Sequence, residues 1–330
     1  MLKAFSRCLQ FAALLAGVAA IAHAQPAWKP EKQVELILPT AAGGANDNIA
    51  RLIQRILQDQ KLVTTPVLVM NKAGGNQTLA SIYLRQHPRD PHFLLYSTSS
   101  VFSAQITGLT QSRYTELTPI ALLMTEYGVV SVGADSPIRT MRDLLARLSA
   151  DPQSLSFGMV TRGGSNHVGL AQAVKTAGID PRRLKSVVFK SNAESYLALA
   201  GGHLNAVVSS ATAAHPFVQQ GTVRMLGVGA PERQPGDLAN VPTFREQGIE
   251  ARTVTNWRGI FAPPGVSAAQ AAFWEDAFAK LVASDDWKKP LDQNNLARYF
   301  LRGKDFEKFL EAEYALSRAV LTELGFAKNP

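Results

Sequence analysis

Two segments of the chain, 120 residues apart, share one pattern, and this repetition limits the folds that the sequence can adopt. "PTAAGGANDNIARLIQRIL" begins at Pro39 and "VTRGGSNHVGLAQAV" begins at Val160. In each, an apolar run is followed by two glycines, one residue, an asparagine, an aspartate or histidine, and apolar residues at the spacing of one helix face. These apolar residues are Ile49, Leu52, Ile53, Ile56 and Leu57, then Leu170, Ala173, Val174 and Ala177. The repetition predicts equivalent strand–loop–helix turns in two halves of one protein.

The rest of the chain alternates short β-type runs with helical patterns. Strands are expected at 34–38, 66–70, 93–97, 118–124, 128–132, 155–157, 186–190, 205–209 and 224–228. Helices are expected from about Asp47, over 78–86, after a capping box of Thr140 and Asp143, and through most of the chain from Ser267 onward. This alternation favours parallel, doubly wound sheets. Because about 300 residues exceed one comfortable core, we expect two domains.

The first 24 residues have the pattern of a secretory signal. Lys3 and Arg7 precede the apolar run "FAALLAGVAAIA", and "AHA" at 22–24 supplies the small residues of a cleavage site, so cleavage is predicted after Ala24. The alternative, a membrane anchor, is disfavoured because the apolar run is too short to span a bilayer comfortably. The only cysteine, Cys8, lies before the apolar run rather than after it, which argues against a lipid anchor. Disulfides and cysteine chemistry are therefore not expected in the exported chain.

The composition narrows the classes of function. The chain is 46% hydrophobic and 18% charged, an ordinary globular balance. Without Lys3 and Arg7, 32 basic and 26 acidic residues leave a net charge of +6, which favours acidic small ligands. The basic residues are scattered without interleaved aromatics, so no nucleic-acid partner is predicted. The six histidines are dispersed, so no metal site is predicted. "GMVTRGGS" lacks the lysine of a phosphate-binding loop, and no cofactor is predicted.

Each glycine loop can be interpreted as an anion-binding site. A helix N-terminus presents free backbone N–H groups and the positive end of the helix dipole, and glycines let an anion approach the backbone. Two such loops facing each other across a cleft could hold a ligand that carries carboxylates. The alternative is that each glycine pair only makes a tight turn, with Asn46 and Ser165 as N-caps.

Side chains at the two loops also allow more than one interpretation. Arg162 could bind a carboxylate through its guanidinium, or it could be a solvated loop residue. We favour Asp47 as a helix cap, while a role in reading a ligand amine or hydroxyl stays open. His167 could hold a ligand, act as a base with Ser165, or be structural. A serine hydrolase is disfavoured, because the G-x-S-x-G turn and an aspartate to orient the histidine are not marked in the sequence.

Taken together, these segments resemble a known family, the periplasmic solute receptors of tripartite tricarboxylate transporters, also called TctC-like or Bug receptors. The further marks of the resemblance are "VLVMNKAGGNQTLA", "FLLYSTSS", "VVFKSNAESYLALAGGHLNAVVSS", "GTVRMLGVGAPER", "NVPTFREQGI" and "NWRGIFAPPGVS". The resemblance implies an α/β, two-domain Venus-flytrap fold of the type II-like class, with mainly parallel sheets and a ligand cleft between the domains. Domain 1 would comprise 25–125 and 254–330, and domain 2 would comprise 126–253.

The resemblance also implies a site for a small carboxylate between the two glycine loops. Carried onto this sequence, the ligand-binding residues would be Ala42, Gly43, Gly44, Asn46, Asp47, Ser97, Ser99, Thr161, Arg162, Gly164, Ser165, His167, Ser191, Asn192, Ser209 and Thr212. The sequence departs from the family at Thr40–Ala41, Ser191, Asn205 and Arg162. These departures leave the fold as expected and bear on the identity of the ligand.

The function that the resemblance implies is that of a periplasmic receptor, not an enzyme. It would act as a monomer that delivers a mono-, di- or tricarboxylate or an aromatic acid to the membrane permease subunits of a secondary transporter. The alternatives are a ligand sensor for a membrane signalling kinase, an exported serine hydrolase using Ser165 and His167, and an exported structural or adhesive protein. The sequence leaves open which acid is bound and which permease or sensor is the partner.

Overall fold

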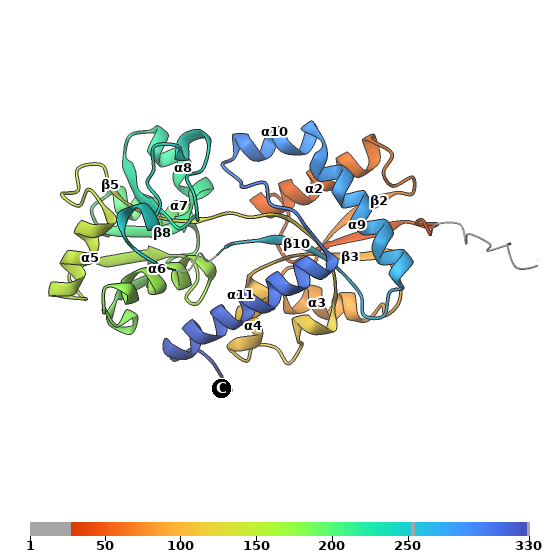
Figure 1. Ribbon diagram of the computed structural model, residues 1–330, viewed down its shortest axis with the longest axis horizontal. Coiled ribbons are helices and arrows are strands. Elements are labelled where there is room, and N and C mark those ends of the chain that lie inside the picture. Colours follow the sequence, from red (N-terminus) through yellow and green to blue (C-terminus); the bar gives the residue numbers. More distant parts are fainter. Residues whose placement is uncertain (1–27, 252–254, 329–330) are drawn as a thin grey trace, which may run out of the picture.

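The computed structural model describes residues 28–251 and 255–328, apart from the side chain of Asp237. The predicted signal, with its cleavage after Ala24, lies outside the described residues. Two lobes lie side by side, and each is built on one β-sheet with helices on both faces (Figure 1). Among the described residues, none of the helices combines the length and the apolar content that crossing a bilayer requires.

The first lobe contains a six-stranded sheet in the order β11-β4-β10-β3-β1-β2. Its strands are β1 (Val34–Leu38), β2 (Val67–Asn71), β3 (Phe93–Thr98), β4 (Thr118–Met124), β10 (Arg258–Ala262) and β11 (Leu301–Arg302). Strand β1 pairs in parallel with β2 and β3, whereas β10 runs antiparallel to both β3 and β4.

Two layers of helices cover this sheet. The apolar faces of α2 (Ala45–Asp59), α9 (Ala268–Ala283) and α10 (Asp285–Gln293) join one core, in which Ile53, Trp274 and Trp287 are buried. A second core contains buried residues of α3 (Thr78–Arg85), α4 (Ser100–Ile106) and α11 (Gly303–Glu323). Short 3₁₀ turns, η1 (Gly75–Gln77) and η2 (Tyr114–Glu116), precede α3 and β4.

The second lobe contains a five-stranded sheet in the order β7-β6-β8-β5-β9. Its strands are β5 (Gly128–Gly133), β6 (Ser156–Met159), β7 (Lys185–Val188), β8 (Ala206–Ser210) and β9 (Val223–Val228). Helices α5 (Met141–Ala150) and α6 (Ser165–Thr176) contribute to one core, and α7 (Asn192–Ala200) and α8 (Ala211–Gln219) to the other. The remaining 3₁₀ turns are η3 (Pro181–Arg183), η4 (Gly236–Leu238) and η5 (Arg245–Gln247).

The elements expected from the sequence are present, but β10 and β11 were not expected as strands. Each expected strand is present within one or two residues, and the capping box of Thr140 and Asp143 forms as predicted. Both sheets are mixed, however, because β5 and β10 run antiparallel to their neighbours. These two strands directly follow the passages of the chain between the lobes. Each of these strands therefore begins at the end of its sheet that faces the other lobe.

The chain passes from the first sheet to the second between Met124 and Gly128, and it returns between Val228 and Arg258. At this junction Glu126 and Asn256 exchange two backbone hydrogen bonds, at 3.2 and 2.9 Å. The domain boundaries at 125/126 and 253/254 stay predictions, and the second of them falls at residues outside the described part. The two passages lie side by side, which is the arrangement of a hinge.

Helix α11 belongs to the first lobe but also packs against α6 of the second lobe. Val168 and Ala171 of α6 share a core with Val320 and Leu321 of α11. At the surface, Lys175 Nζ lies 2.7 Å from a carboxylate oxygen of Glu323. The contact between the lobes therefore extends beyond the two passages of the chain.

Candidate functional site

The two glycine loops have the same local geometry, as their sequences predict. Gly43 and Gly163 adopt positive φ angles of 83° and 76°, which glycine tolerates without a steric penalty. The N–H of Gly43 donates to Asp47 Oδ2 at 3.0 Å, and the N–H of Gly163 donates to His167 Nδ1 at 2.9 Å. In both loops, a side chain four residues later thus binds the N–H of the first glycine. That N–H group is occupied within the loop.

Both helices begin earlier than the alternative interpretation expected, by two residues in the first loop and by one in the second. The N-cap residues are Gly44 and Gly164, and neither helix has a side-chain cap. The proposed N-cap roles of Asn46 and Ser165 are therefore wrong. Both residues lie inside the first turn of their helices.

Asp47 braces the first loop from a buried position. Besides Gly43, its carboxylate accepts hydrogen bonds from Arg51 Nε at 2.8 Å and Asn71 Nδ2 at 3.0 Å. These hydrogen bonds lower the pKa of Asp47 to about 2. The one from Arg51 has the largest effect, followed by those from Gly43 and Asn71. The carboxylate is therefore ionised and already has donors on both oxygens, and it acts as a brace within its loop rather than as an N-cap.

His167 occupies the matching position in the second loop and is also buried. Burial, and then the charge of Arg162, lower the pKa of His167 to about 4. The ring is therefore neutral near pH 7. Because Nδ1 accepts the N–H of Gly163, the proton lies on Nε2. No hydrogen bond joins Ser165 to His167 within residues 28–251 and 255–328.

Arg162 contacts β7, the edge strand of the second sheet. It is exposed, and its NH2 group donates to the backbone carbonyl of Ser186, beside the sheet edge, at 2.9 Å. The sequence predicted a guanidinium that could bind a ligand carboxylate. In this structure the guanidinium instead ties its loop to β7, and Arg162 does not line the cavity described next.

A cavity of about 150 Å³ lies between the lobes and is lined by both of them. Five of the predicted residues line it, namely Ser99, Thr161, Gly164, Ser165 and Asn192. Five more polar residues line it that were not predicted, namely Asn76, Ser100, Ser103, Asn166 and Asn256. Hydroxyl and amide groups dominate, and its described lining includes no lysine or arginine. Such a lining can bind an anion through neutral donors.

The sequence contained a signal for one of the residues that were not predicted. Asn76 follows the glycine pair Gly74–Gly75 in "NKAGGNQT", which is a third glycine loop. Asn76 itself adopts a positive φ of 50°, and its amide donates to Ser103 Oγ at 3.0 Å. Asn166 follows Ser165 in the second loop and could have been found from the shared pattern. Asn256 lies near the return passage, and no local motif marks it.

Several predicted residues lie close to the cavity but do not line it. Ser97 is buried and donates to Gln77 Oε1 at 2.9 Å. Ser209 is buried 2.7 Å from the Tyr196 hydroxyl, and Ser191 is the N-cap of α7. Thr212 Oγ1 crosses between the lobes and donates to the carbonyl of Asn294 at 2.8 Å. These four side chains are committed to contacts within the protein.

The first glycine loop lies outside the cavity lining. Ala42, Gly43 and Gly44 are exposed, and a Cβ atom at either glycine would meet nothing within 4 Å. Asn46 Oδ1 accepts hydrogen bonds from Arg258 Nε at 3.1 Å and from the Tyr96 hydroxyl at 3.2 Å. Contact of this loop with a ligand stays a prediction.

Arg258 links the first loop to the junction between the lobes. It is buried, and besides Asn46 its guanidinium binds the carbonyl of Asn256 at 2.6 Å and lies 3.3 Å from Glu126 Oε2. Asn256 also accepts a hydrogen bond from Ser99 Oγ at 3.3 Å, and Ser99 lines the cavity. One polar network therefore connects both passages of the chain with the cavity wall.

Comparison with known proteins identifies the family of this chain. The model of the "Tripartite tricarboxylate transporter family receptor" matches residues 49–326. The chain belongs to this receptor family. A relative from Cupriavidus necator, named "UPF0065 protein in gbd 5'region", is 27% identical over 319 residues, which cover 94% of each chain.

Solved structures show that the receptor fold is shared. A TctC solute binding protein from Polaromonas, solved with no ligand, has a TM-score of 0.77 and 23% identity, over 89% of this chain and 99% of that chain. A protein of R. palustris, solved with adipate, has a TM-score of 0.75 and 23% identity, over 90% and 99%. The family and the two-domain α/β fold that the sequence predicted are therefore confirmed.

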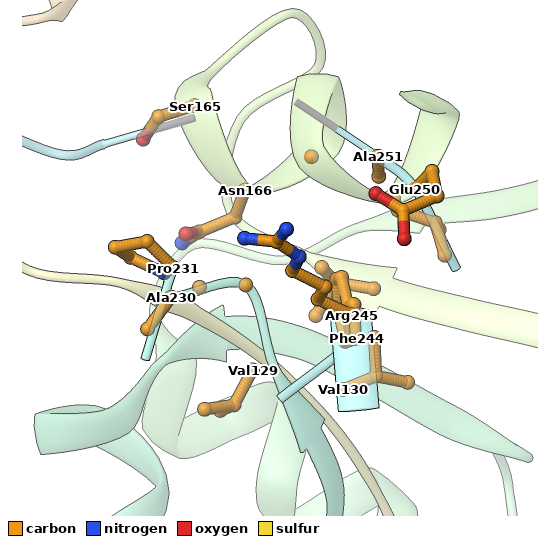
Figure 2. A pocket seen from close by; sticks show the side chains of 15 residues that line it. Val129, Val130, Ser165, Asn166, Ala230, Pro231, Phe244, Arg245, Glu250 and Ala251 are labelled. Carbon is orange, nitrogen blue, oxygen red and sulfur yellow. The ribbon is translucent and has the colours of Figure 1, made fainter. Parts of the chain in front are cut away.

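This receptor also has a second and larger space, which adjoins the cavity. A pocket of about 290 Å³ lies within the second lobe (Figure 2). It is lined by residues of β5, β8 and α6, by residues 229–231, and by residues of the segment from Phe244 to Ala251. Val129, Val130 and Phe244 are among its apolar residues, while Arg245 and Glu250 are its charged ones. Apart from Ser165, which was predicted as a site residue, nothing in the sequence marked this pocket, because its residues come from five separate parts of the chain.

Proposed function

We propose that this receptor binds a small carboxylate in the cavity between its lobes and delivers it to the permease subunits of a secondary tripartite tricarboxylate transporter. The observation that carries the proposal is the polar cavity, because residues of both lobes line it. A ligand that contacts both lobes favours their closed arrangement, and a hinge lies beside the cavity. The adipate bound to the R. palustris neighbour is a carboxylate and supports the same ligand class.

The attraction for the ligand would come from neutral donors. Gly164 and Ser165 place the start of α6 at the cavity, and a helix N-terminus contributes about 0.3–1 kcal/mol toward an anion. Hydroxyl and amide groups of Ser99, Asn192 and Asn256 add hydrogen bonds worth about 1 kcal/mol each. We assign Ala42, Gly43, Gly44 and Asn46 as the opposing loop, which approaches the ligand when the lobes close.

We further propose that the protein is not an enzyme. A serine hydrolase needs a base in contact with the serine hydroxyl. The unprotonated nitrogen of His167 is Nδ1, and it already binds the N–H of Gly163. Turnover of ester substrates that is lost when Ser165 is replaced by alanine would contradict this proposal.

The proposed location and assembly can be tested together. We propose export to the periplasm, cleavage after Ala24, and a monomer as the working form. Mass spectrometry of protein from the periplasmic fraction should give a chain that begins at Gln25, and light scattering should give the mass of one copy. A full-length chain or a stable dimer would contradict the respective proposal.

The deciding experiment for the ligand class is a thermal-shift screen of the mature protein. Bound ligand stabilises the folded state by mass action, so a true ligand raises the melting temperature, and the rise grows with the ratio of ligand concentration to Kd. The panel contains mono-, di- and tricarboxylates, aromatic acids and amino acids, with uncharged amides of the same acids as controls. Stabilisation by an acid but not by its amide supports the proposal, and the absence of any acid effect rejects it.

A further inference from the structure

The pocket in the second lobe is larger and more apolar than the cavity between the lobes. Its volume is about 290 Å³, against about 150 Å³ for the cavity. It is surrounded by buried apolar residues, of which Phe244 is the most exposed, at 7%. The others are Val129 and Val130 of β5, Val208 of β8 and Leu170 of α6. Pockets of about 300 Å³ with mainly apolar walls are typical of small-molecule sites. The pocket therefore suits the apolar body of a ligand.

The pocket and the cavity share part of their lining. Ser165, Asn166 and Val208 line both spaces, so the first turn of α6 stands between them. The side chains of Ser165 and Asn166 have no hydrogen-bond partner in the part of the chain that the structure describes. Two polar groups at the boundary are thus available to a ligand that reaches from one space into the other.

Part of the pocket is charged and open to water. Arg245 and Glu250 are exposed lining residues, and neither forms a side-chain hydrogen bond or ion pair with another described residue. Figure 2 shows the Arg245 guanidinium extending across the pocket toward Asn166, with the Glu250 carboxylate on the other side. A polar end of a ligand can therefore contact Arg245, Glu250 or solvent here. Such a group would not be buried without a hydrogen-bond partner.

We infer that the cavity and the pocket form one elongated ligand site. The carboxylate would lie in the polar cavity, and the body of the ligand would pass Ser165 and Asn166 into the apolar pocket. The ligand class is then a carboxylic acid with an apolar body of about five or more carbons, aliphatic or aromatic, rather than a compact tricarboxylate. This inference rests on the proposed carboxylate function and narrows it.

The affinity of a series of acids tests this inference. Calorimetry on the mature protein uses acetate, butanoate, hexanoate, octanoate and 3-phenylpropanoate, with citrate for comparison. Burying one methylene stabilises a complex by about 0.8 kcal/mol, so each added methylene should tighten binding about threefold to fourfold until the pocket is full. Citrate should bind more weakly than octanoate.

Gly169 offers a way to fill the pocket from inside a helix. It lies in α6 and lines the pocket, and a Cβ atom there would meet nothing within 4 Å. Gly169→Phe should fill the pocket and remove the gain from chain length, while binding of the short acids is kept. Gly169→Ala is the matched control, because it adds one carbon and favours the helix. Pro231→Trp, at an exposed lining residue, is a second blocking variant in case Gly169→Phe does not fold.

The outcomes separate this inference from the proposed function. If short acids bind but affinity does not depend on chain length, or both blocking variants bind long acids normally, the elongated site is wrong and the carboxylate receptor stands. The elongated site is also wrong if octanoate still binds when the cavity is saturated with a short acid, because the pocket is then a separate site. If no acid binds at all, the proposed function itself fails.

Discussion

The backbone N–H of Gly163 donates a hydrogen bond to Nδ1 of His167 at 2.9 Å, and this bond holds the turn that leads into α6. Asp47 holds the equivalent turn in the first lobe through the N–H of Gly43. The same turn is thus braced by a neutral imidazole in one lobe and by a carboxylate in the other. The two loops should therefore respond differently to pH.

The second loop should weaken in mild acid. Burial lowers the pKa of His167 from 6.5 to about 4, so the folded protein binds this proton less readily than the unfolded chain. The resulting stabilisation is fully present above pH 6.5 and is lost as the pH falls toward 4. A shift of this size corresponds to a loss of at most about 3 kcal/mol. Urea denaturation at pH 7 and pH 4 measures the loss.

His167→Asn is the matched control for this prediction. An asparagine oxygen can accept the N–H of Gly163 but does not titrate in this range. The variant should lose less stability than the wild-type protein between pH 7 and pH 4. An equal loss in both proteins would show that other groups cause the pH dependence.

Replacing Asp47 should destabilise the protein without a specific effect on amine ligands. All of its side-chain partners, Gly43, Arg51 and Asn71, are donors, so Asp47→Asn places an amide donor against donors. The melting temperature should fall, and it should fall more than for Arg51→Ala, which removes an exposed partner. A variant of normal stability that has lost binding of amino acids would instead show that Asp47 reads a ligand amine.

Arg162→Ala should leave the affinity for the bound acid almost unchanged, within about twofold, because the guanidinium binds the Ser186 carbonyl outside the cavity.

Ser165→Ala and Asn166→Ala remove donors from the cavity lining and should weaken binding about tenfold, or about 1.4 kcal/mol. Calorimetry with one acid compares the three variants. Tenfold weaker binding by Arg162→Ala would restore the role that the sequence predicted for this residue.

Arg258→Met should be strongly destabilising. It leaves Glu126 buried without its cation, and loss of one partner of a buried ion pair typically costs about 3–5 kcal/mol. The double variant with Glu126→Gln should recover part of this loss, because no charge then stays buried alone. Denaturant titrations measure the free energy of unfolding. If Arg258→Met lowers it by less than about 1 kcal/mol, then water hydrates Glu126 at the hinge in the variant.

Most of the fold could be predicted because each strand or helix is marked by residues within its own segment. Strands such as Val34–Leu38 are short apolar runs, and the capping box at Thr140 is written in four consecutive residues. The direction of β5 was missed, and β10 was not expected as a strand at all. A strand's direction depends on the end of the sheet at which the chain enters. That is a property of the passages between the lobes and not of the strand sequence.

The site was only partly predictable for a related reason. Ser165 and Gly164 lie at the start of a helix that the sequence marks, and they do line the cavity. The directions of Arg162 and His167 depend on partners that are not in the motif, the Ser186 carbonyl and the buried environment around α6. Val130, Gly229 and Phe244 meet in one pocket only after folding.

The position of the single cysteine makes this protein convenient to engineer. Cys8 lies in the predicted signal, so a chain that begins at Gln25 carries thiols only where they are introduced. Ala146 of α5 and Lys280 of α9 are exposed, and Figure 1 shows these helices in opposite lobes. A pair of dyes on cysteines at these two positions would convert movement of the lobes into a change in energy transfer. The receptor could then serve as an optical sensor for its own ligand.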